Sequence, residues 1–334
     1  MSNIIIIPTL SFLACWANNQ SFNQGGYMRI TKVNHIEYYP NTLPVLFKKI
    51  GEYIEYDDAP TEDVVIERLA RTDIAIVEWY TPITSKILSA VSGRLKHIVV
   101  PLTDYTHIDV KAAKKLGITV ANCPNTSTQA VAEHLFALLG AANRKLILAD
   151  RLVREGKRDY YEPFLAIELA GKTLGILGLG TIGKYAAKIG LGYDMVVLGH
   201  SRTPKKLELV KDVELDYLLK HSDIVFVTLE SNASTKALLS RKMLSQMKVS
   251  SFLISISNKE IIDEQAVFDM LENGHLAGAG LDQLQDQSPL INSDKIVLSP
   301  GTAWLTQQTF DRLFNTVYQN VNSFILGSPI NVVD

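Results

Sequence analysis

The stretch "GILGLGTIGK" at residues 175–184 decides the fold, because it places three glycines at fixed spacing between an apolar run and a helical pattern. Gly178, Gly180 and Gly183 form G-x-G-x-x-G directly after Leu174–Leu177, a run typical of a buried strand. The first glycine permits a tight turn, the second lets backbone approach a pyrophosphate, and the third lets helix and strand pack closely. In this strand-to-helix context the pattern predicts a dinucleotide site.

The end of the next strand indicates which dinucleotide is bound. It reads "VVLGHSRTPKK", with Ser201, Arg202 and Thr203 where a site that prefers NAD usually carries Asp or Glu for the ribose 2′-hydroxyl. No carboxylate is present there to repel a 2′-phosphate, and the guanidinium of Arg202 can pair with one. We therefore expect NADP(H) rather than NAD(H), against the alternative of a solvated basic loop with no role.

Strands and helices alternate on both sides of this loop from Met28 onward, which favours βαβ units and parallel sheets. A helix over 129–147 is expected to cross between domains, another covers 305–326, and the tail "SPINVVD" is predicted to return as a strand. The predicted strands lie at 74–77, 97–100, 118–120, 174–177, 195–198, 224–227, 252–255 and 296–298.

Composition excludes several classes of function. The 334 residues suit two domains, and 47% hydrophobic with 20% charged residues is ordinary for a globular protein. The net charge of −2 and scattered Lys and Arg give no basis for binding nucleic acid. Cys15 and Cys123 form neither a disulfide framework nor a zinc motif, so we expect no metal and a reducing cytoplasm. The apolar N-terminal stretch is too short to span a membrane, and residues 1–27 are expected to be an extension outside the fold.

Several further blocks make a family resemblance specific. They are "VANCPNTSTQAVAEHLFALL", "LAGKTLGILGLGTIGKYAAKIG", "HSDIVFVTLESNASTKALLSRKMLSQMK", "LAGAGLDQLQ" and "AWLTQQTFDRLFNTVYQNVNSFILGSPINVV". Together they resemble the D-isomer-specific 2-hydroxyacid dehydrogenases, nearest the hydroxypyruvate reductase and glycerate dehydrogenase branch. The resemblance implies an α/β protein of two Rossmann-like domains, each a doubly wound parallel sheet, with a cleft between them. It also implies a homodimer and a small-molecule substrate.

The same resemblance implies the domain boundaries and completes the cofactor site. Residues 28–125 plus 305–334 would form the flavodoxin-like substrate domain, and 126–304 the NAD(P)-binding domain. Asp282 matches a residue that lies near the nicotinamide in the family. The expected cofactor-binding residues are therefore Gly178, Gly180, Thr181, Ile182, Gly183, Ser201, Arg202, Thr203 and Asp282.

Family members transfer a hydride between a D-2-hydroxy acid and a nicotinamide, and this chemistry needs three side chains. An Arg holds the carboxylate and polarises the carbonyl, a His exchanges the hydroxyl proton, and a Glu orients that His. Aligned by motif, this chain has Asn258 at the Arg position, Gln287 at the Glu position and Gly301 at the His position. We therefore expect that the ordinary family reaction is altered.

Other residues near the expected strand ends are candidates to line a changed pocket. Asp104 replaces a glycine of the family's carboxylate-binding loop, Tyr80 follows the strand 74–77, and Thr302 follows Gly301. A phenol can donate a proton and a threonine can hydrogen-bond a substrate. Each also has a structural explanation, because tyrosine packs at domain seams and threonine caps strand ends.

Three functions remain open from the sequence. The first is an NAD(P)(H)-dependent oxidoreductase whose substrate is a carbonyl or imine other than a simple 2-keto acid. The second is a catalytically inactive relative that binds dinucleotide as a sensor, scaffold or regulatory partner. The third is a non-redox enzyme that uses bound NAD transiently. We favour the first, because the cofactor loop is intact while the three catalytic positions differ.

Overall fold

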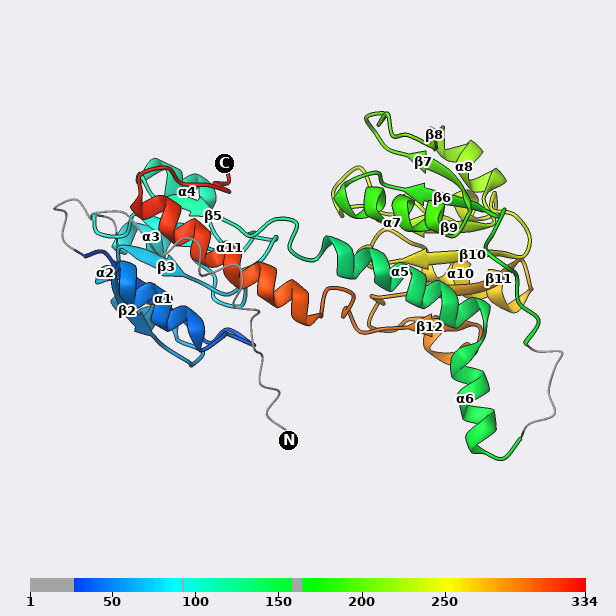
Figure 1. The fold of residues 1–334 in the computed structure, drawn as a ribbon, viewed down its shortest axis with the longest axis horizontal. Helices are drawn as coiled ribbons and strands as arrows, with labels where there is room; N and C mark the ends of the chain where they lie inside the picture. Colours follow the sequence, from blue (N-terminus) through cyan, green and yellow to red (C-terminus); the bar gives the residue numbers. More distant parts are fainter. Residues whose placement is uncertain (1–26, 92, 158–163) are drawn as a thin grey trace. The chain divides into compact units, whose positions relative to one another are not determined.

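The chain folds into two compact units. The computed structural model describes residues 27–91, 93–157 and 164–334, so the predicted extension lies outside the described residues except for Tyr27. Unit 1 comprises the chain up to Thr126 together with Thr306–Asp334, and unit 2 comprises Ser127–Leu305 (Figure 1). The boundaries observed at 126/127 and 305/306 compare with predicted boundaries at 125/126 and 304/305.

The sheet of unit 1 is parallel and is wound in both directions from its first strand. Its strand order in the described residues is β2-β1-β3-β4-β5, and every pairing is parallel. The chain therefore crosses outward in opposite directions from β1, which makes the gap between β1 and β3 a topological switch point. The strands are β1 Arg29–Lys32, β2 Glu52–Glu55, β3 Ile74–Ile76, β4 His97–Val99 and β5 Thr119–Ala121.

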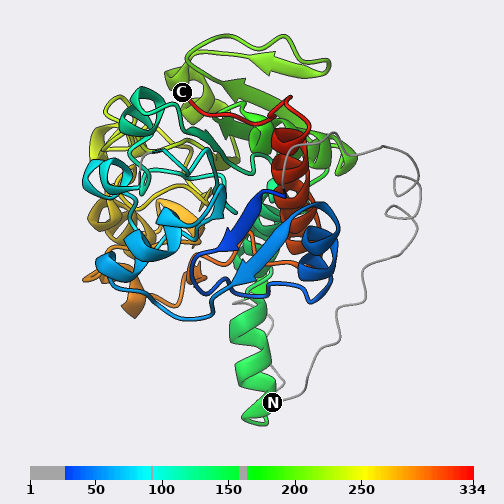
Figure 2. The same ribbon diagram turned by 90° about the vertical axis from the view of Figure 1, so that its left-hand side faces the viewer.

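Helices cover both faces of this sheet (Figure 2). Helices α1 (Thr42–Ile50) and α11 (Gln307–Ile325) pack together on one face, and α2 (Glu62–Ala70), α3 (Ser85–Ala90) and α4 (Val110–Lys115) pack on the other. All three residues of β3 and of β4 are buried, as expected for strands covered on both faces. This arrangement leaves the carboxyl ends of the strands as the edge where polar side chains gather.

The sheet of unit 2 has the strand order of a Rossmann fold. Its described strands run β12-β11-β10-β9-β6-β7-β8, all parallel, so that the switch point lies between β6 and β9. The fold class predicted from the sequence is therefore confirmed. The strands are β6 Thr173–Leu177, β7 Val196–His200, β8 Val210–Asp212, β9 Ile224–Val227, β10 Ser251–Ser255, β11 Leu276–Leu281 and β12 Ile296–Leu298.

Two apolar clusters fill unit 2, one on each face of the sheet. Helices α5 and α7 pack on one face, and α8, α9 and α10 pack on the other. Burial of the sheet on both faces explains why its strands are nearly continuous apolar runs. The helical elements are α5 Thr128–Asn143, α6 Leu146–Arg154, α7 Thr181–Gly192, α8 Leu215–His221, α9 Arg241–Leu244, α10 Glu264–Glu272 and the short 3₁₀ helix η2 Pro289–Asn292.

The prediction of a single helix over 129–147 is wrong, because two helices cover this range. Helix α5 ends at Asn143, and Lys145 takes a left-handed conformation, with φ 49° and ψ 40°, before α6 begins. The apolar pattern continues through the break, so periodicity alone did not reveal it. Both helices belong to unit 2, and the chain leaves unit 1 at Thr126 rather than along a crossing helix.

The C-terminal tail does not form the predicted strand. It makes an isolated antiparallel bridge between Val332 and Ala121 at the end of β5, and the Val333 amide donates to the Val120 carbonyl at 2.8 Å. Gly327 and Pro329 precede this bridge, and a proline has no amide proton to donate to a ladder. Among the described residues, no helix is both long and apolar enough to span a membrane.

Candidate functional site

The loop between β6 and α7 has the geometry that its glycines predict. Gly178 adopts φ +108°, a conformation that strains other residues. A Cβ on Gly183 would lie 1.9 Å from the Gly178 carbonyl oxygen, so strand and helix touch through backbone. Above Gly180, in contrast, a Cβ would meet no atom within 4 Å. The second glycine therefore leaves open the place where a phosphate group approaches.

The N-terminus of α7 supplies the donors for such a phosphate. Gly180 is the N-cap, and the first intrahelical bond runs from the Lys184 amide to its carbonyl at 3.0 Å. The amides of Thr181, Ile182 and Gly183 thus lie in the first turn, which contains no acidic residue and no capping side chain among the described residues. A twelve-residue helix with these donors and a bare glycine loop fits the pyrophosphate of a dinucleotide.

The loop after β7 presents positive charge to solvent. The Ser201 hydroxyl donates to the Thr203 carbonyl at 2.8 Å and closes a tight turn around Arg202. Arg202 is exposed and has no ion-pair partner in the described part of the chain. The structure thus leaves this guanidinium available, as the prediction of a 2′-phosphate contact requires.

Asp282 clamps the loop that follows β12. Its buried carboxylate accepts hydrogen bonds from the Ser299 hydroxyl at 2.5 Å, the Thr302 amide at 3.0 Å and the Ala303 amide at 3.1 Å. His134 Nε2 lies 2.9 Å from the Ser299 hydroxyl and 3.5 Å from the same carboxylate. The structure therefore gives Asp282 a positioning role in this loop, and its contact with a cofactor stays a prediction.

The clamp explains why residue 301 is a glycine. Gly301 has φ +77°, and its amide donates to the Asp282 carbonyl oxygen at 2.5 Å. Space for a side chain exists, since the nearest atoms to a Cβ lie 3.9 Å away, but the left-handed backbone would strain a histidine here. The neighbouring Thr302 is a turn residue. Its amide donates to the Asp282 carboxylate, and its carbonyl accepts from the Leu305 amide.

The other two predicted catalytic positions lie on the surface of unit 2. Asn258 is exposed after β10, and its side-chain oxygen accepts from the Glu260 amide at 3.0 Å, which makes it a local turn former. Gln287 is exposed just before η2. Neither is hydrogen-bonded to the Asp282 clamp in the described residues. Lys259, which can offer charge beside Asn258, instead pairs with the exposed Asp286 at 2.8 Å.

The two candidates in unit 1 have local roles as well. Asp104 is exposed in the loop after β4, where its oxygens accept from the amide and hydroxyl of Thr106 at 2.9 and 3.1 Å. The Tyr80 hydroxyl donates to the His35 carbonyl. Burial, followed by nearby carboxylates including Glu78, raises the pKa of Tyr80 above its usual 10, so this phenol keeps its proton at neutral pH.

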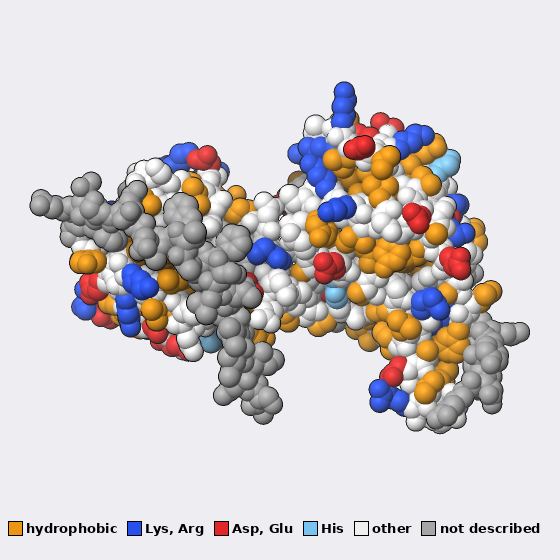
Figure 3. Space-filling view, viewed as in Figure 1, with side chains coloured by type: hydrophobic (Ala, Val, Ile, Leu, Met, Phe, Trp, Pro, Cys, Tyr) orange, Lys and Arg blue, Asp and Glu red, His pale blue; other side chains and the backbone are white. Residues whose placement is uncertain are grey.

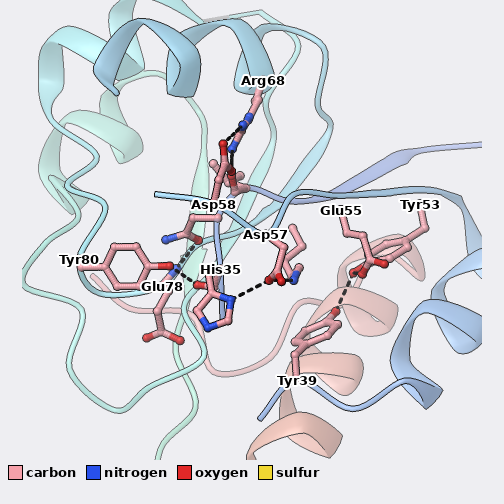
Figure 4. A network of polar contacts seen from close by, with 12 residues as sticks. His35, Tyr39, Tyr53, Glu55, Asp57, Asp58, Arg68, Glu78 and Tyr80 are labelled. Atoms are coloured by element: carbon pink, nitrogen blue, oxygen red, sulfur yellow. Dashed lines mark hydrogen bonds and ion pairs between the residues drawn. The ribbon is translucent and has the colours of Figure 1, made fainter. Parts of the chain in front are cut away.

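Glu78, to which the sequence patterns assign no role, is a buried acid of unit 1 (Figure 4). It follows β3 and is only 8% exposed. Its amide donates to the Asn34 side-chain oxygen at 3.1 Å, and Oε1 accepts from the Trp79 amide at 3.1 Å. Asn34 in turn donates to the Thr81 hydroxyl at 2.7 Å, which joins the segments after β1 and β3.

Burial changes the protonation of this acid. Desolvation raises the pKa of Glu78 to about 7, with Glu37 adding to the rise and the Trp79 amide and His35 opposing it. No cation pairs with the carboxylate in the described residues. One signal was available in the sequence, because "IAIVEWY" puts a carboxylate directly after a fully apolar strand, where a buried acid is rare.

Comparison with known proteins agrees with this geometry. The family model described as D-isomer specific 2-hydroxyacid dehydrogenase, NAD binding domain, matches residues 136–303. The chain belongs to the D-isomer specific 2-hydroxyacid dehydrogenase family. It therefore carries the family's nicotinamide dinucleotide-binding domain, and the match lies in unit 2, where the β6–α7 loop fits a pyrophosphate.

Relatives cover nearly the whole chain. A glyoxylate reductase from Korarchaeum cryptofilum is 33% identical over 86% of this chain and 91% of its own length. A glycerate dehydrogenase from Methylorubrum extorquens is 31% identical over 85% and 92%. The solved structure of an acyclic imino acid reductase (Bsp5) in complex with NADPH and D-Arg is 38% identical, with a TM-score of 0.83 over 92% of this chain and all of that one.

The structure brings some of the predicted residues together and leaves others apart. In unit 2, Asp282, Gly301 and Thr302 form one hydrogen-bonded loop, whereas Asn258 and Gln287 stand on separate surface turns. In unit 1, Tyr80 is near Glu78, as the electrostatic effect of Glu78 on Tyr80 indicates. Among the described residues, no group of three or more His, Cys, Asp or Glu gathers to hold a metal.

The raised pKa of Glu78 makes the stability of unit 1 depend on pH. The folded state holds the Glu78 proton up to about pH 7, while an unfolded glutamate loses it near pH 4.5, so the free energy of unfolding falls as the pH rises between these values. Glu78→Gln stays neutral at every pH. We expect it to raise the free energy of unfolding by on the order of 2 kcal/mol at pH 8 and to leave it unchanged at pH 4.5.

Urea unfolding followed at both pH values measures this difference. Glu55→Gln removes an exposed carboxylate at the end of β2 but keeps a side-chain oxygen that can accept from the Tyr53 hydroxyl, which lies 3.1 Å from Glu55 Oε2. It is the matched control and should differ little from wild type at either pH. A gain for Glu78→Gln that is equal at pH 4.5 and pH 8 would show that folding does not raise the pKa of Glu78.

Proposed function

We propose that the protein is an NADP(H)-dependent reductase that acts on the C=N bond of an imino acid, and on the corresponding D-amino acid in reverse. The likeness to the acyclic imino acid reductase, spread over nearly the whole chain, carries the proposal. Bound NADPH would supply the hydride, and the protein would bind and orient the imine and provide the proton for its nitrogen.

The chemistry of the replaced positions supports an imine over a keto acid. A protonated imine carries positive charge at the reacting carbon before hydride arrives, so it does not need the cation that polarises a keto group. An Arg and an imidazolium beside it would repel it. Neutral Asn258 and Gly301 at the predicted Arg and His positions, with Gln287 at the Glu position, avoid that repulsion.

The remaining predictions about the site belong to the same proposal. Asn258 and Thr302 in unit 2, and Asp104 and Tyr80 in unit 1, stay proposed substrate contacts. The catalytically inactive alternative is not favoured, because the relatives are named as reductases and dehydrogenases. A cytoplasmic location stays a prediction from the two cysteines.

Substrate choice tests the proposed activity directly. We expect the purified protein to reduce NADP⁺ with D-amino acids including D-arginine, and to oxidise NADPH with pyruvate only when excess ammonia is present to form the imine. Glyoxylate and hydroxypyruvate without an amine should react at least about a hundredfold more slowly, since the family's proton-exchanging His is predicted to be absent. Ordinary rates with these keto acids would contradict the proposal, and no turnover of any compound would favour the inactive alternative.

Arg202 tests the choice of cofactor. Arg202→Ala should weaken NADPH binding about tenfold or more while leaving NADH binding unchanged, because a charge-assisted bond to the 2′-phosphate contributes roughly 1.5–3 kcal/mol. Titration of the nicotinamide fluorescence measures both constants. Lys220→Ala, which removes an exposed charge from α8, is the control. An equal loss for the two cofactors would refute the 2′-phosphate contact.

We also propose a homodimer formed through α6, whose apolar side chains are uncovered (Figure 3). No residue of α6 is buried, and Leu146, Ile147 and Val153 are 55, 60 and 53% exposed. An amphipathic helix of this kind requires a partner surface. Ile147→Glu should shift the protein from dimer to monomer in sedimentation velocity, whereas Asp150→Lys on the same helix should not. A wild-type protein that sediments as a monomer would end this proposal.

A further inference from the structure

The carboxyl edge of unit 1 has a topological switch point of its own, between β1 and β3. In open parallel sheets ligands bind in the crevice outside the carboxyl ends of the strands at such a point. The segments that flank it are Asn34 and His35 after β1, and Glu78, Tyr80 and Thr81 after β3. This is the place in unit 1 where the topology favours a ligand.

Hydrogen bonds join the two segments across the switch point. Asn34 is fully buried and bonds both to the Glu78 amide and to the Thr81 hydroxyl. The Tyr80 hydroxyl reaches the His35 carbonyl, and the His35 ring pairs with Asp57 at 2.7 Å. These bonds fix the backbone on both sides, so that the position of the Glu78 side chain is determined by the fold.

The carboxylate of Glu78 is left out of this network. In Figure 4 it extends away from the hydrogen bonds that hold its own backbone. Oε1 accepts only from the adjacent Trp79 amide, and no cation reaches either oxygen in the described residues. A buried carboxyl without a charged partner is costly, and this cost is commonly met at sites that bind a ligand.

We propose that Glu78 binds the nitrogen of the substrate and is its proton donor, an assignment that rests on the proposed imine chemistry. In reduction the Glu78 O–H bond breaks and its proton joins the imine nitrogen. When bound, NADPH would supply the two electrons as hydride for the new C–H bond and would leave as NADP⁺. The C=N π pair would become the lone pair of the amine, and solvent would return one proton to the Glu78 carboxylate.

Protonation of Glu78 suits this role at neutral pH. A general acid works best when its pKa is near the working pH, and burial holds the pKa of Glu78 at about 7. After proton transfer, its carboxylate can accept a hydrogen bond from an N–H of the product amine. The titratable groups that face it or share its edge are His35 and Glu37 after β1, Asp57 and Asp58 after β2, Tyr80 after β3, Asp104 and His107 after β4, and Cys123 after β5.

These neighbours are less suited to donate. The Tyr80 proton is bonded to the His35 carbonyl, and the pKa of Tyr80 lies above its usual value. Burial lowers the pKa of His107, so that this imidazole is neutral at pH 7. Burial, with Glu78 adding to it, raises the pKa of the Cys123 thiol well above its usual range. Of Tyr80, His107, Cys123 and Glu78, Glu78 is the group whose pKa lies near neutral pH.

The test compares Glu78→Gln, Glu78→Asp and the control Glu55→Gln. With pyruvate, excess ammonia and NADPH, wild-type kcat/KM for the imine should fall above about pH 7, and the reverse reaction with D-arginine should rise there. Glu78→Gln should lose about a hundredfold or more and the inflection with it. Glu78→Asp should keep activity with a shifted inflection, and Glu55→Gln should match wild type.

A second readout does not depend on turnover. In the infrared spectrum of the protein without ligands, a carboxylic-acid C=O band should titrate near pH 7 in wild type and be missing in Glu78→Gln. NADPH affinity should be the same in all variants, which separates loss of the proton donor from loss of the fold. If Glu78→Gln is unfolded, Glu78→Asp alone decides by its shifted inflection.

The outcomes separate the two proposals. If the wild-type protein turns over no imine and no D-amino acid, the proposed function is overturned. The assignment of Glu78 as the proton donor is then overturned as well. Wild-type protein that is active on imines, with Glu78→Gln equally active and equally dependent on pH, overturns the role of Glu78 alone.

Discussion

The close approach of α7 to β6 is the constraint on which unit 2 depends. With the Gly183 Cβ position only 1.9 Å from the Gly178 carbonyl oxygen, strand and helix meet through bare backbone. This contact aims the first-turn amides of α7 at one point outside the sheet. The neighbouring strands β7 and β9 then lie on either side of that point, and their loops supply Arg202 and Thr228 around it. Binding of the dinucleotide follows from this geometry.

The two units use their buried acids in opposite ways. In unit 2 the Asp282 carboxylate accepts three hydrogen bonds and holds the loop that contains Gly301. In unit 1 the Glu78 carboxyl accepts one bond from its neighbour and has no charged partner among the described residues. The first acid stabilises a turn, whereas the second costs stability. A group kept at such a cost is suited to chemistry, which the Asp282 clamp is not.

Much of the fold could be predicted from the sequence, because long apolar strands and glycine spacing are local signals. The predicted strands near 224–227, 252–255 and 296–298 match β9, β10 and β12. The break at Lys145 was not predicted, since apolar residues continue through it on the helical pattern. The tail was predicted as a strand from its composition, but pairing partners in unit 1 limit it to one bridge.

For the site, the sequence by itself determined the cofactor loop, because the positive φ of Gly178 and the close approach of Gly183 to the Gly178 carbonyl are both local to the loop. It also marked Asn258, Gln287 and Gly301 as unusual. Only the tertiary structure determined that Glu78 is buried and that its pKa is raised. Its burial, its anchor on Asn34 forty-four residues away and the raised pKa all come from segments that meet only when the parallel sheet forms. Ionisation depends on the surroundings in space, and those surroundings cannot be read from local spacing.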